Sequence, residues 1–214
     1  MACCQAEIRG AGRFFSRFAR RHRKHYQKKG LDKSQRQLVE GLRRAGYAGA
    51  TILEIGCGVG YLHQWLLKAG ALSAVGVDLS QRMLEEARLL AHEQGLIERV
   101  TYRQGDFVEL ADSLNGADVC LLDKVVCCYP DPEHLIEKSL ARTRRVYALT
   151  YPRDRWYTRL GVALTRLLLW LVRSPFRNYV HDPVRIEAWI AAAGFRKHSE
   201  DTTLIWLTQV YVRE

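Results

Sequence analysis

The chain has 214 residues, 48% of which are hydrophobic, and a formal net charge of +10. This length allows one domain with a sizeable buried core. The most apolar stretch, residues 160–172, is too short to span a bilayer and contains Arg166, and the arginine-rich start lacks the apolar segment of a secretory signal. We therefore expect a cytoplasmic protein whose positive charge favours acidic partners.

Cysteine spacing argues against a disulfide framework and against a zinc site. The cysteines form two adjacent pairs and two isolated positions, and no C-x-x-C spacing occurs. They are Cys3, Cys4, Cys57, Cys120, Cys127 and Cys128. We expect free thiols and no bound metal.

The first 30 residues form the most basic part of the chain, with no acid from residue 8 to residue 31. Residues 1 to about 10 are expected to be poorly ordered. Residues 11–29 are expected to form a basic amphipathic helix that ends at Gly30. Its aromatic and histidine side chains recur at helical spacing and are Phe14, Phe15, Phe18, His22 and Tyr26.

Three roles are compatible with this basic helix. In the first, it packs on the domain edge and exposes a solvated basic face. In the second, it is a flap over a ligand pocket, with His22 or Tyr26 near the ligand. In the third, residues 9–29 contact a membrane surface or RNA, because a short basic helix with aromatic side chains on one face can lie at a lipid interface. A second helix is expected to begin at Asp32 or Ser34.

Thr51–Ile55 is an apolar, β-branched run that predicts a buried strand, and residues 61–69 have the apolar spacing of a helix. Between them lie Gly56, Gly58 and Gly60. Glycine allows a tight turn and close approach of a ligand, and the start of the helix offers free N–H groups. The spacing G-x-G-x-G fits poorly to the dinucleotide fingerprint G-x-G-x-x-G.

Three further strand-like runs follow, and each leads into an acid. Residues 74–78 end at Asp78, the run at 99–103 leads to Asp106, and residues 117–123 end at Asp123. Ser80 is expected to cap a helix that continues to about residue 94. With a fifth strand at 144–150, strand and helix alternate five times, which predicts a parallel sheet covered by helices on both faces.

Residues 151–181 break this alternation. A long apolar helix is expected from Trp156 to Leu171, with Arg155, Arg159, Arg166 and Arg173 near one stripe. Because it follows the fifth strand, it lies where ligands bind in such sheets and is interpreted as a substrate lid, with an ordinary crossover helix as the alternative. A helix from Asp182 to Gly194 and a final hairpin at 195–212 complete the chain.

The three glycines, with Glu54 two residues before the first, resemble motif I of the class I S-adenosylmethionine (SAM) methyltransferases. The resemblance implies a Rossmann-like, doubly wound, mostly parallel sheet of seven strands, with SAM as cofactor and S-adenosylhomocysteine as product. It covers a domain at 31–214, preceded by the basic helix at 1–30 and carrying the lid at about 151–181.

The same resemblance assigns the cofactor residues. Glu54 serves the methionine end of SAM, and Asp106 and Phe107 meet the adenine. A carboxylate at the tip of the second strand, Asp78, can accept hydrogen bonds from both ribose hydroxyls. The full set of candidate cofactor residues is Glu54, Gly56, Cys57, Gly58, Gly60, Asp78, Leu79, Gly105, Asp106, Phe107 and Asp123.

The loop after the fourth strand, residues 122–131, is not of the Asn/Asp-Pro-Pro-Tyr/Phe type, which disfavours N-methylation of nucleic acid. With Tyr129-Pro130, residues 151–153, the lid helix and the segment Ser174–His181, the chain loosely resembles the magnesium-protoporphyrin IX O-methyltransferases. We expect O-methylation of an anionic small molecule, a carboxylate or a phenol. The candidate catalytic residues are Tyr129 and His181. The candidate substrate residues are Tyr26, Cys127, Cys128, Arg155, Arg159 and Tyr179.

The acceptor chemistry leaves alternatives open. A carboxylate needs cations but no general base, whereas a phenol or thiol gains from a base such as His181. Cys127 and Cys128 are soft ligands, so S-methylation or methylation of a metalloid or chalcogen compound is a second interpretation. In the simpler alternative, the two cysteines are buried and structural. A non-enzymatic SAM-fold protein attached to membrane or RNA by its basic helix is a third.

Overall fold

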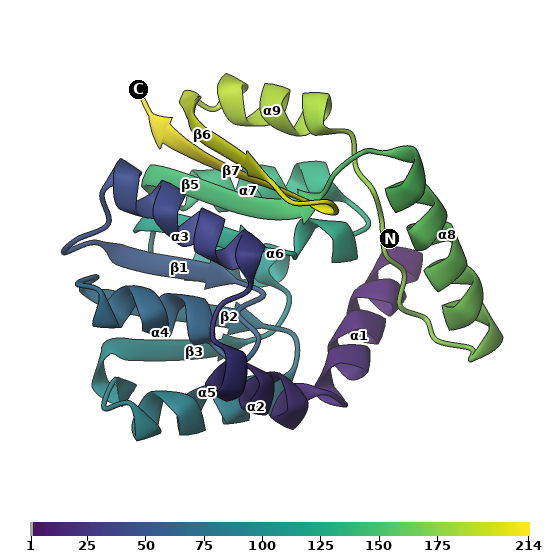
Figure 1. The fold of residues 1–214 in the computed structure, drawn as a ribbon, viewed down its shortest axis with the longest axis horizontal. Coiled ribbons are helices and arrows are strands. Elements are labelled where there is room, and N and C mark those ends of the chain that lie inside the picture. The colour runs from purple at the N-terminus through teal and green to yellow at the C-terminus, as the bar shows by residue number, and fades with distance from the viewer. Residues whose placement is uncertain (1) are drawn as a thin grey trace.

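The computed structural model describes residues 2–214, with side chains from residue 6 onward. One seven-stranded sheet runs through the molecule in the order β3-β2-β1-β4-β5-β7-β6, with helices on both faces (Figure 1). The first five strands are parallel, and β7 pairs antiparallel with both β5 and β6. The prediction of a doubly wound, mostly parallel sheet is confirmed. Cys3 and Cys4 lie outside the described side chains.

The strands begin and end close to the predicted positions. They are β1 Thr51–Ile55, β2 Ser73–Asp78, β3 Val100–Gln104, β4 Ala117–Asp123, β5 Thr143–Pro152, β6 Phe195–Thr202 and β7 Trp206–Arg213. The helices are α1 Ala2–Ser16, α2 Ala19–Lys29, α3 Lys33–Ala45, α4 Tyr61–Lys68, α5 Gln81–Glu93, α6 Phe107–Leu110, α7 Pro132–Ala141, α8 Trp156–Leu171 and α9 Pro183–Ala192. Short 3-10 turns lie at Ile97–Arg99, Ala111–Ser113 and Val126–Cys128.

Side-chain caps set the starts of several helices. The Asp32 side chain accepts from the N–H of Gln35 in a reciprocal capping box that begins α3. Ser80 accepts from the N–H of Met83 and begins α5, as predicted. Asp131 and Asp182 each precede a proline at the first helical position and cap α7 and α9. A capping side chain satisfies a backbone donor that has no partner within the helix, so these polar residues fix where each helix begins.

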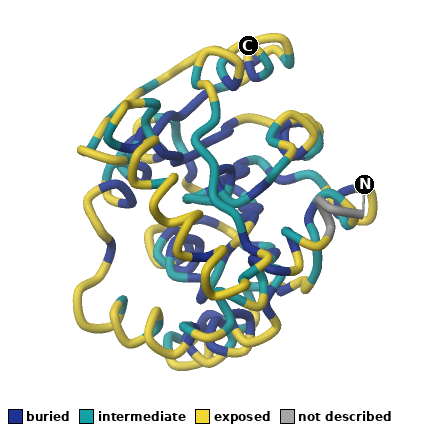
Figure 2. The backbone as a smooth tube through the Cα atoms, turned by 90° about the vertical axis from the view of Figure 1, so that its right-hand side faces the viewer, coloured by how far each residue is buried: buried dark blue, intermediate teal, exposed yellow. Residues whose placement is uncertain are grey.

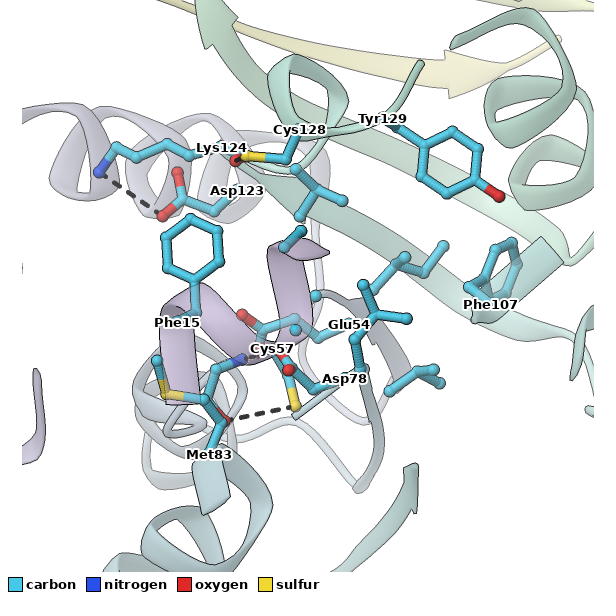
Figure 3. Close-up of a pocket in the computed structure, with 18 of the residues that line it drawn as sticks. Phe15, Glu54, Cys57, Asp78, Met83, Phe107, Asp123, Lys124, Cys128 and Tyr129 are labelled. Carbon is cyan, nitrogen blue, oxygen red and sulfur yellow. Dashed lines mark hydrogen bonds and ion pairs between the residues drawn. The ribbon is translucent and has the colours of Figure 1, made fainter. Parts of the chain in front are cut away.

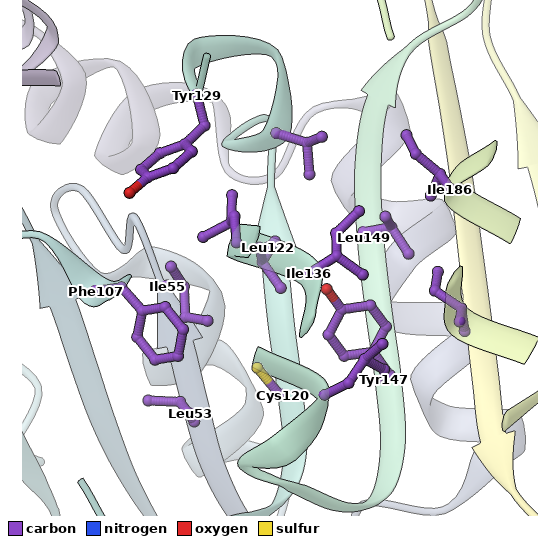
Figure 4. Packing of buried hydrophobic residues seen from close by; sticks show 14 of the residues in the cluster. Leu53, Ile55, Phe107, Cys120, Leu122, Tyr129, Ile136, Tyr147, Leu149 and Ile186 are labelled. Carbon is purple, nitrogen blue, oxygen red and sulfur yellow. The ribbon is translucent and has the colours of Figure 1, made fainter. Parts of the chain in front are cut away.

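The two faces of the sheet bury separate apolar clusters. Alternate residues of β1 point to opposite faces, so Ile52 packs beneath α3 and α4 whereas Leu53 and Ile55 pack on the other side. On that second face, Tyr147 and Leu149 of β5 lie with Ile136 of α7 and Ile186 of α9 (Figure 4). A parallel sheet buried on both faces holds the carboxyl ends of its strands rigidly, which is the edge where the acids lie.

The N-terminal segment differs from the prediction. Helix α1 begins at Ala2, so the expected disorder of residues 1–10 is wrong for the described part, and a break at residues 17–18 separates α1 from α2. An added Cβ at Gly10 would lie 2.8 Å from Phe176 N and from Pro175 Cγ. This glycine lets α1 pack closely against a segment far away in the sequence, a contact that local spacing does not reveal.

Helix α8 lies beside α1 at one end of the molecule (Figure 1). Only Thr158 and Leu169 of this helix are buried, and the face of the molecule in Figure 2 shows long exposed stretches. Leu169 packs with Ala11 and Phe176, so one contact area joins α8, α1 and the segment after α8. No helix in the described chain is long and apolar enough to cross a membrane.

Candidate active site

A cavity of about 370 Å³ opens at the carboxyl ends of β1, β2 and β4. Its walls come from these strand ends, from α1, and from the loop that follows β4 (Figure 3). The predicted residues that line it are Glu54, Gly56, Cys57, Gly58, Asp78, Leu79, Gly105, Asp106, Phe107, Asp123, Cys127, Cys128 and Tyr129. The sequence patterns therefore point to one place in the fold.

The three glycines of the turn have different structural roles, although all three have positive φ. An added Cβ at Gly56 would meet the Val125 side chain at 2.4 Å, and one at Gly60 would meet the His63 ring at 2.7 Å. At Gly58 an added Cβ meets no protein atom within 4 Å. Gly58 therefore leaves the backbone bare beside the cavity, whereas Gly60 lies outside the cavity wall and is needed for packing.

Asp78 is bound to the glycine turn. Its Oδ2 accepts from the N–H of Gly58 and its Oδ1 from the N–H of Ser80, both at 2.8 Å. Burial raises the pKa of Asp78 to about 6, and these two N–H donors oppose the rise. The carboxylate is thus fixed at the tip of β2, with its remaining acceptor positions available to a ligand.

Glu54 of β1 is partly engaged by α4, the helix that follows its strand. Its Oε2 accepts from the backbone N–H of His63 at 3.1 Å and lies 2.5 Å from His63 Nδ1. The other ring nitrogen of His63 contacts the Tyr102 hydroxyl at 3.0 Å. The acid expected at the methionine end of SAM is therefore positioned by a fully buried histidine, which the sequence patterns did not single out.

Asp106 and Tyr129 form a second fixed pair. The Tyr129 hydroxyl donates to both carboxylate oxygens of Asp106 at 3.0 Å, while Asp106 Oδ1 also accepts from the N–H of Val108. Burial raises the pKa of Asp106, and burial together with this neighbouring acid raises the pKa of Tyr129. The hydroxyl proposed as catalytic therefore faces the acid assigned to adenine.

Asp123, which lines the cavity, carries a buried oxygen without a hydrogen-bond partner among the described residues. Its Oδ2 accepts from Gln35 Nε2 at 2.8 Å and lies 3.7 Å from Lys124 Nζ, but Oδ1 is buried without a hydrogen-bond partner in the described chain. The side chain is only 6% exposed. Because a buried, unpaired carboxylate oxygen is costly, Oδ1 marks a position for a hydrogen-bond donor on a ligand.

The cysteine pair belongs to the cavity wall. Cys127 and Cys128 have sulfur atoms 3.8 Å apart, and both thiols approach the Lys124 carbonyl oxygen. The hydrogen bond with Cys127 and burial raise the pKa of Cys128. Cys128 is therefore a protonated thiol at neutral pH rather than a soft thiolate ligand.

The other predicted site residues lie outside the cavity wall. Tyr26 stacks on Tyr61, which does line it, and Tyr179 contacts Glu7 through its hydroxyl. His181 Nε2 lies 3.1 Å from the carbonyl oxygens of both Val126 and Tyr129, so it carries a proton and donates to the loop. The remaining two are Arg155 and Arg159, which are exposed, with Arg159 paired to Asp154.

A family profile described as "Methyltransferase domain" matches residues 52–148, the span from β1 to β5. "Ubiquinone biosynthesis O-methyltransferase" of Pseudomonas paraeruginosa is 30% identical over 158 residues, 71% of this chain and 66% of that protein. The protein of the same name from Azorhizobium caulinodans is 35% identical over 69% of this chain and 59% of its own length. The chain thus spans less than two thirds of these relatives.

The chain therefore contains a methyltransferase domain at residues 52–148. Its fold agrees with that of magnesium protoporphyrin IX methyltransferase from Synechocystis PCC 6803 with bound SAM, at a TM-score of 0.66 and 20% identity over 89% of this chain and 80% of that one. A putative sarcosine dimethylglycine methyltransferase from Galdieria sulphuraria gives a TM-score of 0.68 at 13% identity, over 85% and 86% of the two chains.

The cavity has the chemistry that the cofactor of this methyltransferase family requires. SAM carries a positive sulfonium and an ammonium group, and four carboxylates line the cavity: Glu54, Asp78, Asp106 and Asp123. The bare backbone at Gly58 and the unpaired oxygen of Asp123 are further places where a ligand fits. This set of acidic acceptors therefore suits a cationic nucleoside.

The methyltransferase site also contains residues that the sequence patterns missed. They are Ala11, Gly12, Tyr61, Met83, Lys124, Val125, Leu135 and Trp206. Lys124 has a left-handed backbone with φ of 61° and places its Nζ 2.6 Å from Asp32 and 5.3 Å from the centre of the Trp206 ring. For Lys124, the one available signal in the sequence was its position directly after the end of β4. No local pattern marks Trp206, which reaches the cavity from the start of β7.

Proposed function

We propose that this chain transfers the methyl group of SAM to an oxygen atom of a small molecule with an apolar body and a hydroxyl group. The observation that carries the proposal is the composition of the cavity, in which strand-end carboxylates face a wall of apolar and thiol side chains. That wall includes Phe15, Val125, Cys127 and Cys128. The name of the curated relatives supports oxygen as the methylated atom.

In this proposal the carboxylates of Glu54, Asp78 and Asp106 and the glycine turn hold the cofactor, whereas Asp123 serves the acceptor. Asp78 accepts from the ribose hydroxyls, Asp106 and Phe107 border the adenine, and the backbone at Gly58 lies against the ligand. SAM supplies an activated methyl group when bound. The protein therefore contributes position, alignment and exclusion of water, since no strong acid or base is needed to activate the donor.

Helix α1 closes the site in this proposal. Phe15 forms part of the cavity wall, an added Cβ at Gly12 would lie 3.0 Å from Leu79 Cβ, and Ser16 Oγ lies 2.6 Å from Ser80 Oγ. These contacts join α1 to the loop after Asp78. The flap expected at residues 11–29 is thus assigned mainly to α1, while α2 contributes His22 to the cavity wall.

The charges around the acceptor side favour a hydroxyl over a carboxylate. The ammonium of Lys124 is already shared between Asp32 and Asp123, and the lid residues Arg155 and Arg159 lie outside the cavity wall. A carboxylate acceptor would lack a cation to hold it. A phenolic or enolic hydroxyl instead donates to the unpaired Oδ1 of Asp123, whose pKa is raised by burial, and becomes a better nucleophile.

The proposed test measures label transfer from methyl-labelled SAM to panels of phenols, catechols, carboxylic acids, thiols and metalloid oxyanions. We expect label on a hydroxyl compound and a loss of at least tenfold in kcat/KM for Asp123→Asn, with little change in SAM affinity. Glu98→Gln, an exposed change on the 3-10 turn before β3, is the matched control. Label found only on carboxylates, thiols or metalloids would contradict the proposal. SAM binding without transfer to any panel would favour a binding protein.

A further inference from the structure

Helix α8 exposes an unusual amount of apolar surface. Thirteen large hydrophobic residues of the described chain are exposed, and eight of them lie between residues 156 and 172. Each of the eight is 52–76% exposed, and they are Trp156, Leu160, Leu164, Leu167, Leu168, Trp170, Leu171 and Val172. The other five are Leu72 before β2, Leu89 on α5, Val184 on α9, and Leu204 and Ile205 between β6 and β7, so α8 carries the largest group among the described residues. Contiguous apolar patches of this kind mark interaction sites.

The patch faces away from the protein. Thr158 and Leu169, the buried residues of α8, lie on one side of the helix, and Leu160, Leu164 and Leu171 recur at spacings of four and seven on the opposite side. Arg159 and Arg166, seven residues apart, share a stripe along one flank between these two sides. The helix therefore has a protein side, an arginine flank and an outward apolar side.

The rim of the patch is positively charged. Arg155 and Arg173 stand at the two ends of α8, and both are exposed. On the neighbouring α1 and directly after it, Arg9, Arg13 and Arg17 recur every four residues, are exposed, and form no ion pair within the described chain. The acid Asp154 neutralises Arg159 but leaves these five arginines unpaired. Their charge complements an anionic surface.

We propose that α8 lies flat in the surface of an anionic lipid bilayer. Its 16 residues give a length of about 24 Å, with apolar side chains directed into the lipid and arginines at the level of the headgroups. Trp156 and Trp170, near the two ends, suit the interface, where amphipathic rings collect. The arginines attract anionic lipids, and the apolar face supplies the insertion that charge alone lacks.

This placement brings the membrane surface close to the residues that line the cavity. Leu169 of α8 belongs to one apolar cluster with Ala11 and Phe176, and Phe15 and Cys128, which line the cavity, pack against that cluster. A bilayer on the outer side of α8 would therefore lie one helix away from the wall of the site. Bilayer binding itself does not depend on the proposed methyl transfer, so each is testable without the other.

The experiment is vesicle flotation with the full chain. Vesicles of phosphatidylcholine alone are compared with vesicles containing about one third phosphatidylglycerol. We expect binding to the anionic vesicles and a loss of at least tenfold in the Leu164→Glu/Leu168→Glu variant, which changes only exposed positions. Leu72→Glu, an equally exposed leucine that precedes β2 at the opposite end of the strands, is the matched control and is expected to bind normally.

Insertion of α8 into the bilayer is measured separately, by tryptophan fluorescence. Brominated lipids should quench tryptophan fluorescence of the bound protein, and the Trp156→Phe/Trp170→Phe variant should lose that quenching, because the other tryptophans are not on α8. Three results would overturn the proposal: no binding to either vesicle, binding that the glutamate variant retains, or a concentration-dependent dimer in solution that this variant abolishes while vesicles never bind.

Discussion

The Asp78 carboxylate accepts a hydrogen bond from the backbone N–H of Gly58 at 2.8 Å. This contact joins the tip of β2 to the middle of the glycine turn, two segments that are 20 residues apart. It fixes the orientation of an acid that borders the cavity and leaves acceptor positions free. The turn and the acid are thus structurally coupled, and we expect a change in either of them to weaken ligand binding at the other.

Replacement of Asp78 by alanine should weaken SAM binding by about tenfold to a hundredfold, because each hydrogen bond to a charged group contributes roughly 1.5–3 kcal/mol. Isothermal titration calorimetry measures the change. Glu98→Gln removes an exposed acid outside the cavity and should leave the affinity unchanged. Unaltered affinity in Asp78→Ala would refute the ribose assignment.

The affinity for SAM should fall as the pH drops below about 6, the pKa to which burial raises Asp78. A protonated Asp78 accepts hydrogen bonds poorly, so the dissociation constant should rise by about tenfold per pH unit in this range. The ligand-free protein responds in the opposite sense. Since the folded-state pKa lies above the ordinary 3.8, ionised Asp78 lowers stability above pH 6, and this loss disappears as the pH falls toward 3.8. A flat affinity profile between pH 5 and pH 8 would count against this role.

Gly10→Ala should loosen the packing of α1 and raise the dissociation constant for SAM several-fold. Its Cβ would lie 2.8 Å from the backbone nitrogen of Phe176, a distance that real contacts do not reach, so the helix must move. Gly161→Ala on α8 is the matched control, because its Cβ meets nothing within 4 Å and alanine favours a helix. Thermal unfolding and calorimetry on both variants test this, and equal behaviour of the two would disprove the closing role of α1.

His181 should act as a positioning residue. Its Nε2 proton is shared by the carbonyl oxygens of Val126 and Tyr129, and burial lowers its pKa, which keeps the ring neutral. His181→Gln can supply an N–H donor and should keep most activity, whereas His181→Ala should lose about tenfold or more. If His181 were the general base, both variants would lose activity, and the pH–rate profile would change in the same way for both.

The sequence was sufficient for the parts of the site that depend on local patterns. Asp78 and Asp123 end their strands and Asp106 closely follows one. Parallel strands bring their carboxyl ends to one edge, so these three acids reach the same cavity without knowledge of long-range contacts. The glycine turn was visible for the same reason. What the pattern could not assign was the partner of each acid, such as the buried His63 beside Glu54 or the Tyr129 hydroxyl on Asp106.

The sequence was insufficient where a residue's role depends on distant segments. Helix α1 is held by Pro175 and Phe176, and Trp206 reaches the cavity from the start of β7. His181 has the residue type of a base, yet its geometry is that of a donor to a loop 52–55 residues earlier. Residue type and helical spacing indicate which side chains are capable of chemistry, but only tertiary contacts decide which of them face the cavity.

The close contact of Gly10 with the segment at residues 175–176 has a consequence for biosynthesis. The first helix leaves the ribosome long before its docking surface exists, because more than 160 residues separate the two. During that interval the side of α1 that packs on Pro175 and Phe176, including Phe14, has no native partner. We therefore expect the sheet to form first and α1 to dock last, so that the nascent chain is most vulnerable to proteases and chaperone capture at the segment that later closes the pocket.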